Sequence, residues 1–270
     1  VGHYAEQDAR LTYLLWQRFK HELSKQDLGT VWELEKTLLP YLIDMRQRGV
    51  RVDVEKAALL RANFKSKEKD ILHQINKLCG KDIDIWNARQ IGFAFDKLNI
   101  DYPKTPKSGE PSFTQQWLLS DPNDISKLIV RAREINKFHS TFLASVMKYE
   151  HKGRIHAEIQ QLRSDSGGTV SGRLSMSNPN LQQLPARNKE LGPLIRGLFL
   201  PEEGCKWGSF DYSQQEPRMA VHYASAIGYE GSQELVDAYA NASADFHQTV
   251  ADIVGIDRKQ AKTIGLGLMY

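Results

Sequence analysis

The stretch Ser209–Arg218 constrains the fold of this chain most, because a strand, a turn and a helix meet within it. The residues Cys205–Phe210 alternate large and small side chains and end in an aromatic residue, a pattern that predicts a short buried strand. The residues Met219–Ala224 predict a helix. Asp211 therefore stands where a strand gives way to a turn, and a carboxylate there can leave the sheet and meet a metal ion. Mg²⁺ is usually held by one or two carboxylates together with substrate phosphates.

A purely structural role explains the same residues. Asp at the end of a strand is typical of a turn, and Ser213 followed three residues later by Glu216 matches the helix capping box. The local pattern alone favours this structural interpretation, so the rest of the chain has to decide between the two.

Length and composition limit the possible classes of protein without identifying one. A chain of 270 residues allows one large domain or two ordinary ones. No run approaches the roughly 18 apolar residues of a membrane span, and no signal peptide is recognisable. Cys79 and Cys205 lie far apart and form no metal pattern, which favours a reduced, intracellular protein. The net charge of +3 is too small to indicate a polyanionic partner by itself.

Two segments that predict long helices are rich in basic residues, Val54–Cys79 and Ser126–Met147. The second includes Arg133 and Lys137. A lysine-rich helix is most often only a solvated face. This pattern therefore permits a nucleic-acid partner without establishing one.

The segment Ser164–Arg187 has many amide side chains and little apolar periodicity, which predicts a surface loop. Its donors have a second interpretation, because every correctly paired step of a DNA minor groove offers the same acceptors. Donors facing that groove check pairing geometry without reading sequence. Four residues are candidates for this role: Arg173, Asn180, Gln182 and Gln183.

The last thirteen residues, Arg258–Tyr270, predict a helix with one ordered face. At 100° per residue, four side chains fall within an arc of about 120° and span roughly 18 Å: Arg258, Lys262, Leu266 and Tyr270. The face runs from two cations through an apolar side chain to an aromatic ring, which is the order of triphosphate, sugar and base in a nucleotide. Gly265 and Gly267 each destabilise a helix by about 1 kcal/mol relative to Ala. Their presence therefore predicts that the helix approaches a neighbouring group closely or bends at these positions.

The segment Asp211–Arg218 resembles motif A of the DNA polymerase I family (family A), whose usual form is Asp-Tyr-Ser-Gln-Ile-Glu-Leu-Arg. Six of those eight letters are kept, and Gln215 and Pro217 are the departures. The resemblance implies that Asp211 is a catalytic metal ligand, helped by the backbone carbonyl of Tyr212.

The segment Arg258–Tyr270 looks like motif B of the same family, usually Arg-x-x-x-Lys-x-x-Asn-Phe-Gly-x-x-Tyr-Gly, with Gly265 at the Asn position and Leu266 at the Phe position. Asp245-Phe246-His247 resembles the Asp-Ile-His of the fingers, where the His lies near the triphosphate. A lone His is usually structural, so both interpretations of His247 stay open. The resemblance implies a nucleotide site made of Gln214, Glu216, His247, Arg258, Lys262, Leu266 and Tyr270.

The resemblance also assigns roles within that site. Glu216 would be the gate that packs against the sugar of the incoming nucleotide and excludes a 2'-hydroxyl. Arg258 and Lys262 would neutralise charge on the triphosphate, which makes both catalytic, and Lys262 is the candidate general acid for the leaving pyrophosphate. Leu266 stands where an aromatic residue helps discriminate against nucleotides that lack a 3'-hydroxyl.

Two further segments resemble DNA-binding parts of the family. Ser171–Arg187 is similar to Thr-Gly-Arg-Leu-Ser followed by Pro-Asn-Leu-Gln-Asn-Ile-Pro-x-Arg, and Lys137–Phe142 resembles a thumb segment that ends in Ser-Thr-Tyr. The residues expected to contact the primer–template are Arg133, Lys137, Arg173, Asn180, Gln182, Gln183 and Arg187. Arg187 would support the primer end or the incoming phosphates.

Tyr4 and Asp8 lie four residues apart on one face of a predicted helix, 3–23. An ordinary exposed helix start explains that spacing. The pair also looks like the last motif of the 3'-5' exonuclease that precedes the polymerase domain in this family. In that case Asp8 is a metal ligand and Tyr4 orients the attacking water.

The resemblance implies an α+β, helix-rich fold with the right-hand polymerase architecture, in which a thumb, part of the palm and the start of the fingers follow the last helix of an exonuclease domain. The expected divisions are 1–27 for the exonuclease tail, 28–53 for the segment leading into the polymerase domain, 54–150 for the thumb, 151–232 for the partial palm and 233–270 for the fingers.

The implied chemistry is nucleotidyl transfer to a primer 3'-hydroxyl by two Mg²⁺ ions, with Mn²⁺ as a substitute, and the implied partners are primer–template DNA and dNTPs, with no membrane. Clamp or helicase partners are not specified. The expected location is the cytoplasm of a bacterium or of a phage-infected cell. The second palm Asp of the family lies beyond motif B, so we expect the 270-residue piece to be inactive alone.

Two other classes remain open. A single-subunit RNA polymerase shares parts of motifs A and B, although Glu216 and the Gly-Arg-Leu-Ser segment argue against it. A non-catalytic DNA-binding remnant would bind primer–template in a salt-dependent way, yet its complete polypeptide would not synthesise DNA.

Overall fold

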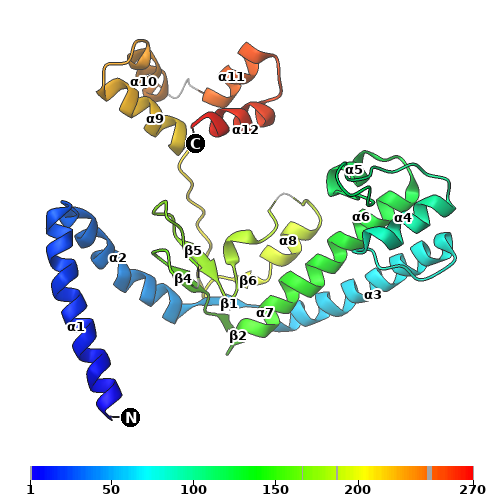
Figure 1. Cartoon of the computed structure of the whole chain (residues 1–270), viewed down its shortest axis with the longest axis horizontal. Coiled ribbons are helices and arrows are strands. Elements are labelled where there is room, and N and C mark those ends of the chain that lie inside the picture. Colours follow the sequence, from blue (N-terminus) through cyan, green and yellow to red (C-terminus); the bar gives the residue numbers. More distant parts are fainter. Residues whose placement is uncertain (1, 166, 187, 242–244, 270) are drawn as a thin grey trace. The chain divides into compact units, whose positions relative to one another are not determined.

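The computed structural model describes residues 2–165, 167–186, 188–241 and 245–269 (Figure 1). Contacts divide the chain into two compact units, Val1–Lys206 and Trp207–Tyr270. Helices dominate both, and short strands pair in the first. The predicted helix-rich α+β class is therefore confirmed. None of the helices in these described ranges combines the length and the hydrophobicity of a membrane span.

The first unit begins with two long helices, α1 (Gly2–Lys25) and α2 (Gly29–Arg48). The rings of Trp16 and Trp32 meet across them, with centroids 5.1 Å apart. α2 ends at Gly49, whose φ is +60°, and a Cβ there would lie 2.8 Å from the carbonyl oxygen of Ile155. Glycine is the residue that tolerates both conditions, so the chain can turn from α2 directly into a strand.

A four-stranded sheet of the first unit has the order β2-β3-β1-β6. Its strands are β1 (Val50–Val52), β2 (Glu150–His151), β3 (Arg154–Ile155) and β6 (Phe199–Leu200). They pair antiparallel, and β1 lies between two segments from distant parts of the sequence. A second sheet pairs β4 (Glu158–Gln160) with β5 (Ser175–Ser177). The chain 154–162 thus contributes to two sheets rather than to one strand.

The other helices of this unit are α3 (Val54–Cys79), α4 (Ala88–Lys97), α5 (Gln115–Ser120), α6 (Asp124–Lys137), α7 (Ala144–Tyr149) and α8 (Leu191–Arg196). Asp53 caps α3 by accepting a hydrogen bond from the N–H of Lys56 at 2.9 Å. The predicted helix over Ser126–Met147 is confirmed, but a π-helix at Phe138–Leu143 interrupts its α-helical geometry. π-Helical turns are frequent at functional sites.

Two apolar clusters hold these helices together. One includes the buried side chains of Ile75 on α3, Phe95 on α4 and Ile129 on α6. The other includes Phe64 and Phe138, whose rings meet edge to face at 4.7 Å. Burying a side chain of this size stabilises a fold by roughly 1.5–3 kcal/mol. α3 and α6, which lie side by side in Figure 1, therefore form the framework of this part of the unit.

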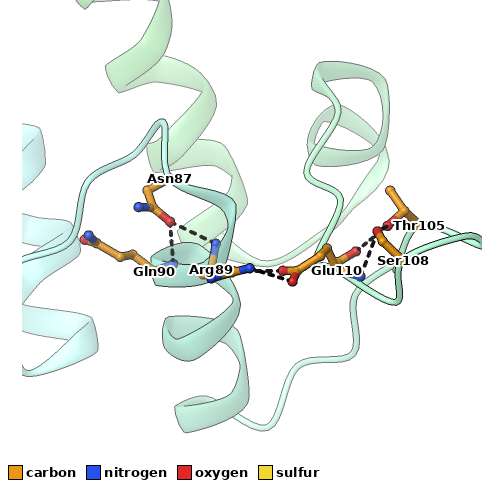
Figure 2. A network of polar contacts seen from close by, with 6 residues as sticks. All are labelled: Asn87, Arg89, Gln90, Thr105, Ser108 and Glu110. Carbon is orange, nitrogen blue, oxygen red and sulfur yellow. Dashed lines mark hydrogen bonds and ion pairs between the residues drawn. The ribbon is translucent and has the colours of Figure 1, made fainter.

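Figure 2 shows polar contacts that close the loop between α4 and α5. Arg89 forms a bidentate pair with Glu110, with N···O distances of 3.0 and 2.8 Å. The hydroxyls of Thr105 and Ser108 lie 2.6 Å apart, and Asn87 accepts hydrogen bonds from two N–H groups in the first turn of α4. Exposed ion pairs contribute little to stability, so this network fixes the course of the loop more than it stabilises the unit.

The second unit consists of α9 (Gln215–Ala226), α10 (Ser232–Ala240), α11 (Phe246–Val254) and α12 (Arg258–Met269). α9 packs on α10, and α11 packs on α12. The helices predicted after motif A and over motif B are thereby confirmed within the described residues.

The strand predicted for Cys205–Phe210 is wrong. This segment has no regular structure, and Phe210 is 97% exposed. A strand exists only through its ladder of hydrogen bonds to a neighbour, and no segment among the described residues pairs with it. The alternating pattern reports which side chains suit a strand and not whether a partner strand is available.

Candidate functional site

Asp211 and Tyr212 lie in an exposed, irregular segment just before α9. Gln214 follows in the left-handed conformation, with φ of +53°, and is the N-cap of α9. The capping box predicted from Ser213 and Glu216 is wrong, because α9 has its N-cap at Gln214 and no side-chain capping hydrogen bond. The turn after Asp211 is therefore held by other contacts.

Arg218 provides two of those contacts. Its Nε donates to the carbonyl oxygen of Ser213 at 2.9 Å, and its Nη1 donates to that of Tyr239 at 3.4 Å. The guanidinium carbon lies 4.6 Å from the centroid of the Tyr239 ring, within cation–π range. Arg218 thus ties the turn that follows Asp211 to the end of α10. Sequence reasoning misses this role, although its place at the end of motif A was the available signal.

Gln214 provides a third contact. Its Oε1 accepts a hydrogen bond of 3.0 Å from the backbone N–H of Phe246, the first residue of α11. The motif A turn is therefore connected to the start of α11 as well as to the end of α10. Within the second unit, motif A and the predicted fingers residues belong to one hydrogen-bonded arrangement.

Asp245 organises the start of α11. Its Oδ1 accepts from the N–H groups of His247 and Gln248, each at 3.1 Å, and so caps the helix. Its Oδ2 accepts from Nε and Nη2 of Arg258 at 2.9 and 2.8 Å. Partial burial raises the pKa of Asp245, but the N–H of Gln248 and the Arg258 guanidinium outweigh it and hold that pKa below its usual range. A single carboxylate thereby caps α11 and orients the first cation of α12.

His247 is 4% exposed, and its Nδ1 has no hydrogen-bond partner in the part of the chain that the structure describes. Burial is the main cause of its lowered pKa, and the positive charges of Lys262 and Arg258 add to it. The imidazole is therefore neutral at pH 7. A buried polar atom without a partner is unusual, so the ring has one unused hydrogen-bonding position near two cations.

α12 presents the predicted face. Arg258 and Lys262 are exposed and Leu266 is half-buried, while Ala261 and Gly265 are buried. Tyr270, the aromatic end of the predicted face, lies outside the described residues. The predicted order of two cations followed by an apolar side chain is therefore present in Arg258, Lys262 and Leu266.

The two glycines of motif B differ in their surroundings. A Cβ at Gly265 would lie 3.0 Å from Cε1 of Phe246, which confirms the predicted close approach. A Cβ at Gly267 would meet nothing within 4 Å, so close approach does not explain that glycine, and bending there stays a prediction. Of the two glycines, Gly265 is the one that packs closely against a neighbouring side chain.

The predicted minor-groove segment belongs to the first unit. Two of its polar side chains form hydrogen bonds within the segment and stabilise its own conformation. Asn180 Oδ1 accepts from the N–H of Gln182 at 3.0 Å and caps a 3₁₀ turn, Leu181–Gln183. Gln182 bonds to the backbone of Met176 and Leu174, each at 3.1 Å. Arg173 and Gln183 are exposed. Arg187 lies outside the described residues.

Arg133 and Lys137 have different surroundings on α6. Arg133 donates from Nε to the carbonyl of Ile85 at 2.8 Å and from Nη1 to that of Phe113 at 3.1 Å. Its guanidinium lies 5.2 Å from the Trp86 ring centroid. Lys137 is exposed and lines, with Arg133 and Trp86, a hollow of about 570 Å³. Arg133 thus joins α6 to two loops. A DNA phosphate contact stays a prediction for both Arg133 and Lys137.

The predicted metal ligands are not surrounded by further side chains that could bind a metal among the described residues. Tyr4 and Asp8 are exposed on α1, and Asp211 stands in an irregular segment. No group of three or more His, Cys, Asp or Glu side chains that could hold a metal occurs among the described residues. Asp211 and the Tyr212 carbonyl are oxygen donors of the kind that Mg²⁺ prefers, but they form only part of a ligand set.

Comparison with known proteins identifies relatives along nearly the whole chain. Residues 54–270 match the sequence model of DNA polymerase family A. A DNA-directed DNA polymerase of Pseudomonas phage M6 is 41% identical over an alignment that covers 100% of this chain and 43% of that protein. DNA polymerase DpoZ of Acinetobacter phage SH-Ab 15497 is 33% identical and is covered to 47%. The chain therefore spans less than half the length of these relatives.

One solved structure has a similar fold. The POL domain of Pol1 from M. smegmatis, in complex with DNA primer-template and dNTP, superimposes with a TM-score of 0.68 at 23% sequence identity. The match covers 87% of this chain and 41% of that one. At this identity the likeness shows the fold.

Proposed function

Because the chain belongs to DNA polymerase family A, we propose that it forms the thumb, part of the palm and the start of the fingers of a template-directed DNA polymerase. The divisions 1–27, 28–53, 54–150, 151–232 and 233–270 are part of this proposal. The complete polypeptide would extend a primer 3'-hydroxyl with dNTPs. The Pol1 structure of the same fold is a complex with DNA primer-template and dNTP, which supports both partners.

One observation carries the proposal. Gln214 of motif A binds the N–H of Phe246 at 3.0 Å, and the neighbouring Asp245 holds Arg258 of motif B at 2.9 Å. The carboxylate-bearing turn and the cationic helix are thereby joined through two side chains. Nucleotidyl transfer requires the groups that bind the metal and the groups that neutralise the phosphates to be held in fixed positions relative to one another.

The metal would be Mg²⁺, in two ions, or Mn²⁺ in its place. Asp211 and the Tyr212 carbonyl would supply part of its ligand set, and the phosphates of the nucleotide another part. When bound, such ions stabilise the charge on the phosphate under attack and on the attacking and leaving oxygens. Asp8 and Tyr4 would belong to a separate exonuclease site that needs further carboxylates.

The side chains of the second unit would bind the nucleotide. Arg258 and Lys262 would neutralise the triphosphate, and Lys262 would donate a proton to the leaving pyrophosphate. The neutral ring of His247 would donate a hydrogen bond from its Nδ1–H to a phosphate oxygen. Glu216, Gln214, Leu266 and Tyr270 complete the proposed sugar and base contacts.

Primer–template contacts would come from the first unit. Lys137 would bind a phosphate, and the exposed donors Arg173 and Gln183 would face the minor groove, with Asn180 and Gln182 shaping the loop that carries them. Arg133 and Arg187 complete the proposed set. Contacts of this kind give salt-dependent affinity with little sequence preference. The relatives include phage polymerases, so the enzyme would act in the cytoplasm of a bacterium or of a phage-infected cell.

Primer extension by the complete polypeptide tests the function, with dNTPs and rNTPs compared for the natural sequence and for Glu216→Ala. We expect incorporation of dNTPs, and a larger share of rNTPs in the variant because the gate is removed. Glu230→Ala, which removes an exposed carboxylate of the same unit, is the control. A preference of the natural sequence for rNTPs would identify an RNA polymerase relative. DNA binding without any extension would identify a non-catalytic remnant.

A further inference from the structure

Phe246 and Gly265 occupy one space between α11 and α12. A Cβ at Gly265 would lie 3.0 Å from Cε1 of Phe246 and 3.9 Å from its Cδ1 and Cζ. A separation of 3.0 Å is shorter than nine in ten real Cβ contacts. A side chain at position 265 would therefore press against the edge of the Phe246 ring, which would have to shift to admit it.

Two small side chains of the same helices are also buried. Ala261, one turn before Gly265 and on the same side of α12, is 0% exposed, and Ala251 of α11 is 3% exposed. Alanine and glycine allow two helices to approach closely. Phe246 is a large residue at the start of α11, and we expect its contact with Gly265 to help set the distance between the helices there.

The backbone of Phe246 is fixed at the same time. Its N–H donates to Oε1 of Gln214 in motif A, and its neighbour Asp245 binds Arg258 of α12. Its other neighbour, His247, is buried near Lys262 and Arg258. A change in ring size at position 246 would therefore alter the distance of α12 from motif A and the position of its cations.

Both residues depart from the motifs that the chain resembles, with Phe in place of Ile at 246 and Gly in place of Asn at 265. The larger side chain faces the smaller one. Substitutions that conserve the total volume of a packed contact are tolerated best, whereas adding volume on one side alone forces side chains from their rotamers.

We propose that Phe246 and Gly265 are a matched packing pair that positions Arg258 and Lys262 for the triphosphate of the incoming nucleotide. Phe246 is a positioning residue and touches no reacting atom. The identity of the ligand rests on the proposed function, while the pairing itself rests on the geometry between α11 and α12.

A double-mutant cycle in the complete polypeptide tests the pair, with Gly265→Asn, Phe246→Ile and the double variant. Steady-state primer extension gives KM for dNTP and kcat, and thermal unfolding gives Tm. Gly265→Asn alone should raise KM for dNTP about tenfold, because the added side chain displaces the ring and with it the cations. The double variant should return to within about twofold of the natural KM and recover Tm. Thr263→Asn, at an exposed position of the same helix, is the control and should leave both quantities nearly unchanged.

Three results would overturn the pair. Additive effects of the two changes on Tm and KM would show that the residues do not share a space. If the double variant recovered Tm but not KM, the contact between the two residues would stabilise the fold without positioning the cations. A Gly265→Asn defect that Phe246→Ile leaves in place would mean that position 265 acts on the nucleotide directly. If the natural polypeptide lacked polymerase activity, coupling in Tm would still establish the pair while the proposed function failed.

Discussion

The guanidinium of Arg258 directs Nε and Nη2 at the same carboxylate oxygen of Asp245, at 2.9 and 2.8 Å. The other oxygen of Asp245 caps α11. The first cation of motif B is therefore held in place by the helix cap that precedes it by thirteen residues. This arrangement makes the stability of α11 and the orientation of Arg258 depend on one side chain.

Replacing Asp245 should separate its two roles. Asp245→Ala removes the cap and the ion pair and should destabilise the protein by about 1–2 kcal/mol, whereas Asp245→Asn keeps a capping oxygen and should cost less. The pKa of Asp245 is lowered in the folded state, so its contribution is complete above the unfolded value near 4 and is lost as the pH falls through the folded value. Thermal unfolding from pH 7 to pH 3 measures both effects. Asp252→Ala, an exposed acid of the same helix, is the control, and an equal loss there would contradict the assignment.

His247 should make the stability of the protein depend on pH at higher pH values than Asp245 does. Its pKa is lowered by burial and by two cations, so the unfolded chain binds more protons than the folded one just below pH 6.5. Stability is therefore complete above pH 6.5 and falls as the pH drops towards the folded pKa. Thermal unfolding at pH 7.5 and pH 5.5 should show a smaller loss for His247→Gln than for the natural protein. Identical losses would mean that the imidazole is not held neutral.

Arg218→Lys should loosen the turn that carries Asp211. Lysine cannot donate to the carbonyls of Ser213 and Tyr239 at once in the same fork geometry. We expect a loss of about 1 kcal/mol of stability and a larger fall in kcat than in primer–template affinity. Arg196→Lys changes an exposed arginine elsewhere and is the control. A pure affinity loss with unchanged kcat would be incompatible with a role in placing Asp211.

Lys137→Ala should weaken primer–template binding and reduce the slope of log K against log salt by about 1, as expected for one lost phosphate contact. Lys127→Ala on the same helix removes a lysine that pairs with Asp124 and is the control. Arg133→Lys keeps the positive charge, so it should leave the salt slope unchanged, but it should lower Tm because the carbonyls of Ile85 and Phe113 lose the guanidinium that donates to both. If Arg133→Lys altered the slope and Lys137→Ala did not, the roles assigned to the two residues would be reversed.

The sequence predicts the helices well because their signals are local. The cap at Asp53, the periodic apolar residues of α6 and the cation spacing of α12 lie within a few turns of one another. The π-helical turn at 138–143 carries no such signal, since its geometry follows from packing around Phe138 and Leu143.

The site is less predictable where its contacts are distant in sequence. The resemblance to motifs A and B identifies Asp211 and Lys262 as candidates. The hydrogen bond between Gln214 and Phe246 joins residues 32 positions apart, and no local pattern in the sequence indicates it. The half-buried guanidinium of Arg133 likewise donates to carbonyls that are distant in sequence, those of Ile85 and Phe113. The strand predicted at 205–210 is wrong because side-chain alternation cannot report whether a partner strand is present.

Primer extension by Asp211→Ala tests the central claim most directly. The complete polypeptide, with Mg²⁺, dNTPs and a labelled primer–template, should lose at least about a hundredfold in single-turnover rate, because the metal loses a carboxylate ligand. Primer–template affinity should stay within about twofold of the natural value, since Asp211 is not among the proposed DNA contacts. Extension at the natural rate by Asp211→Ala would contradict the account.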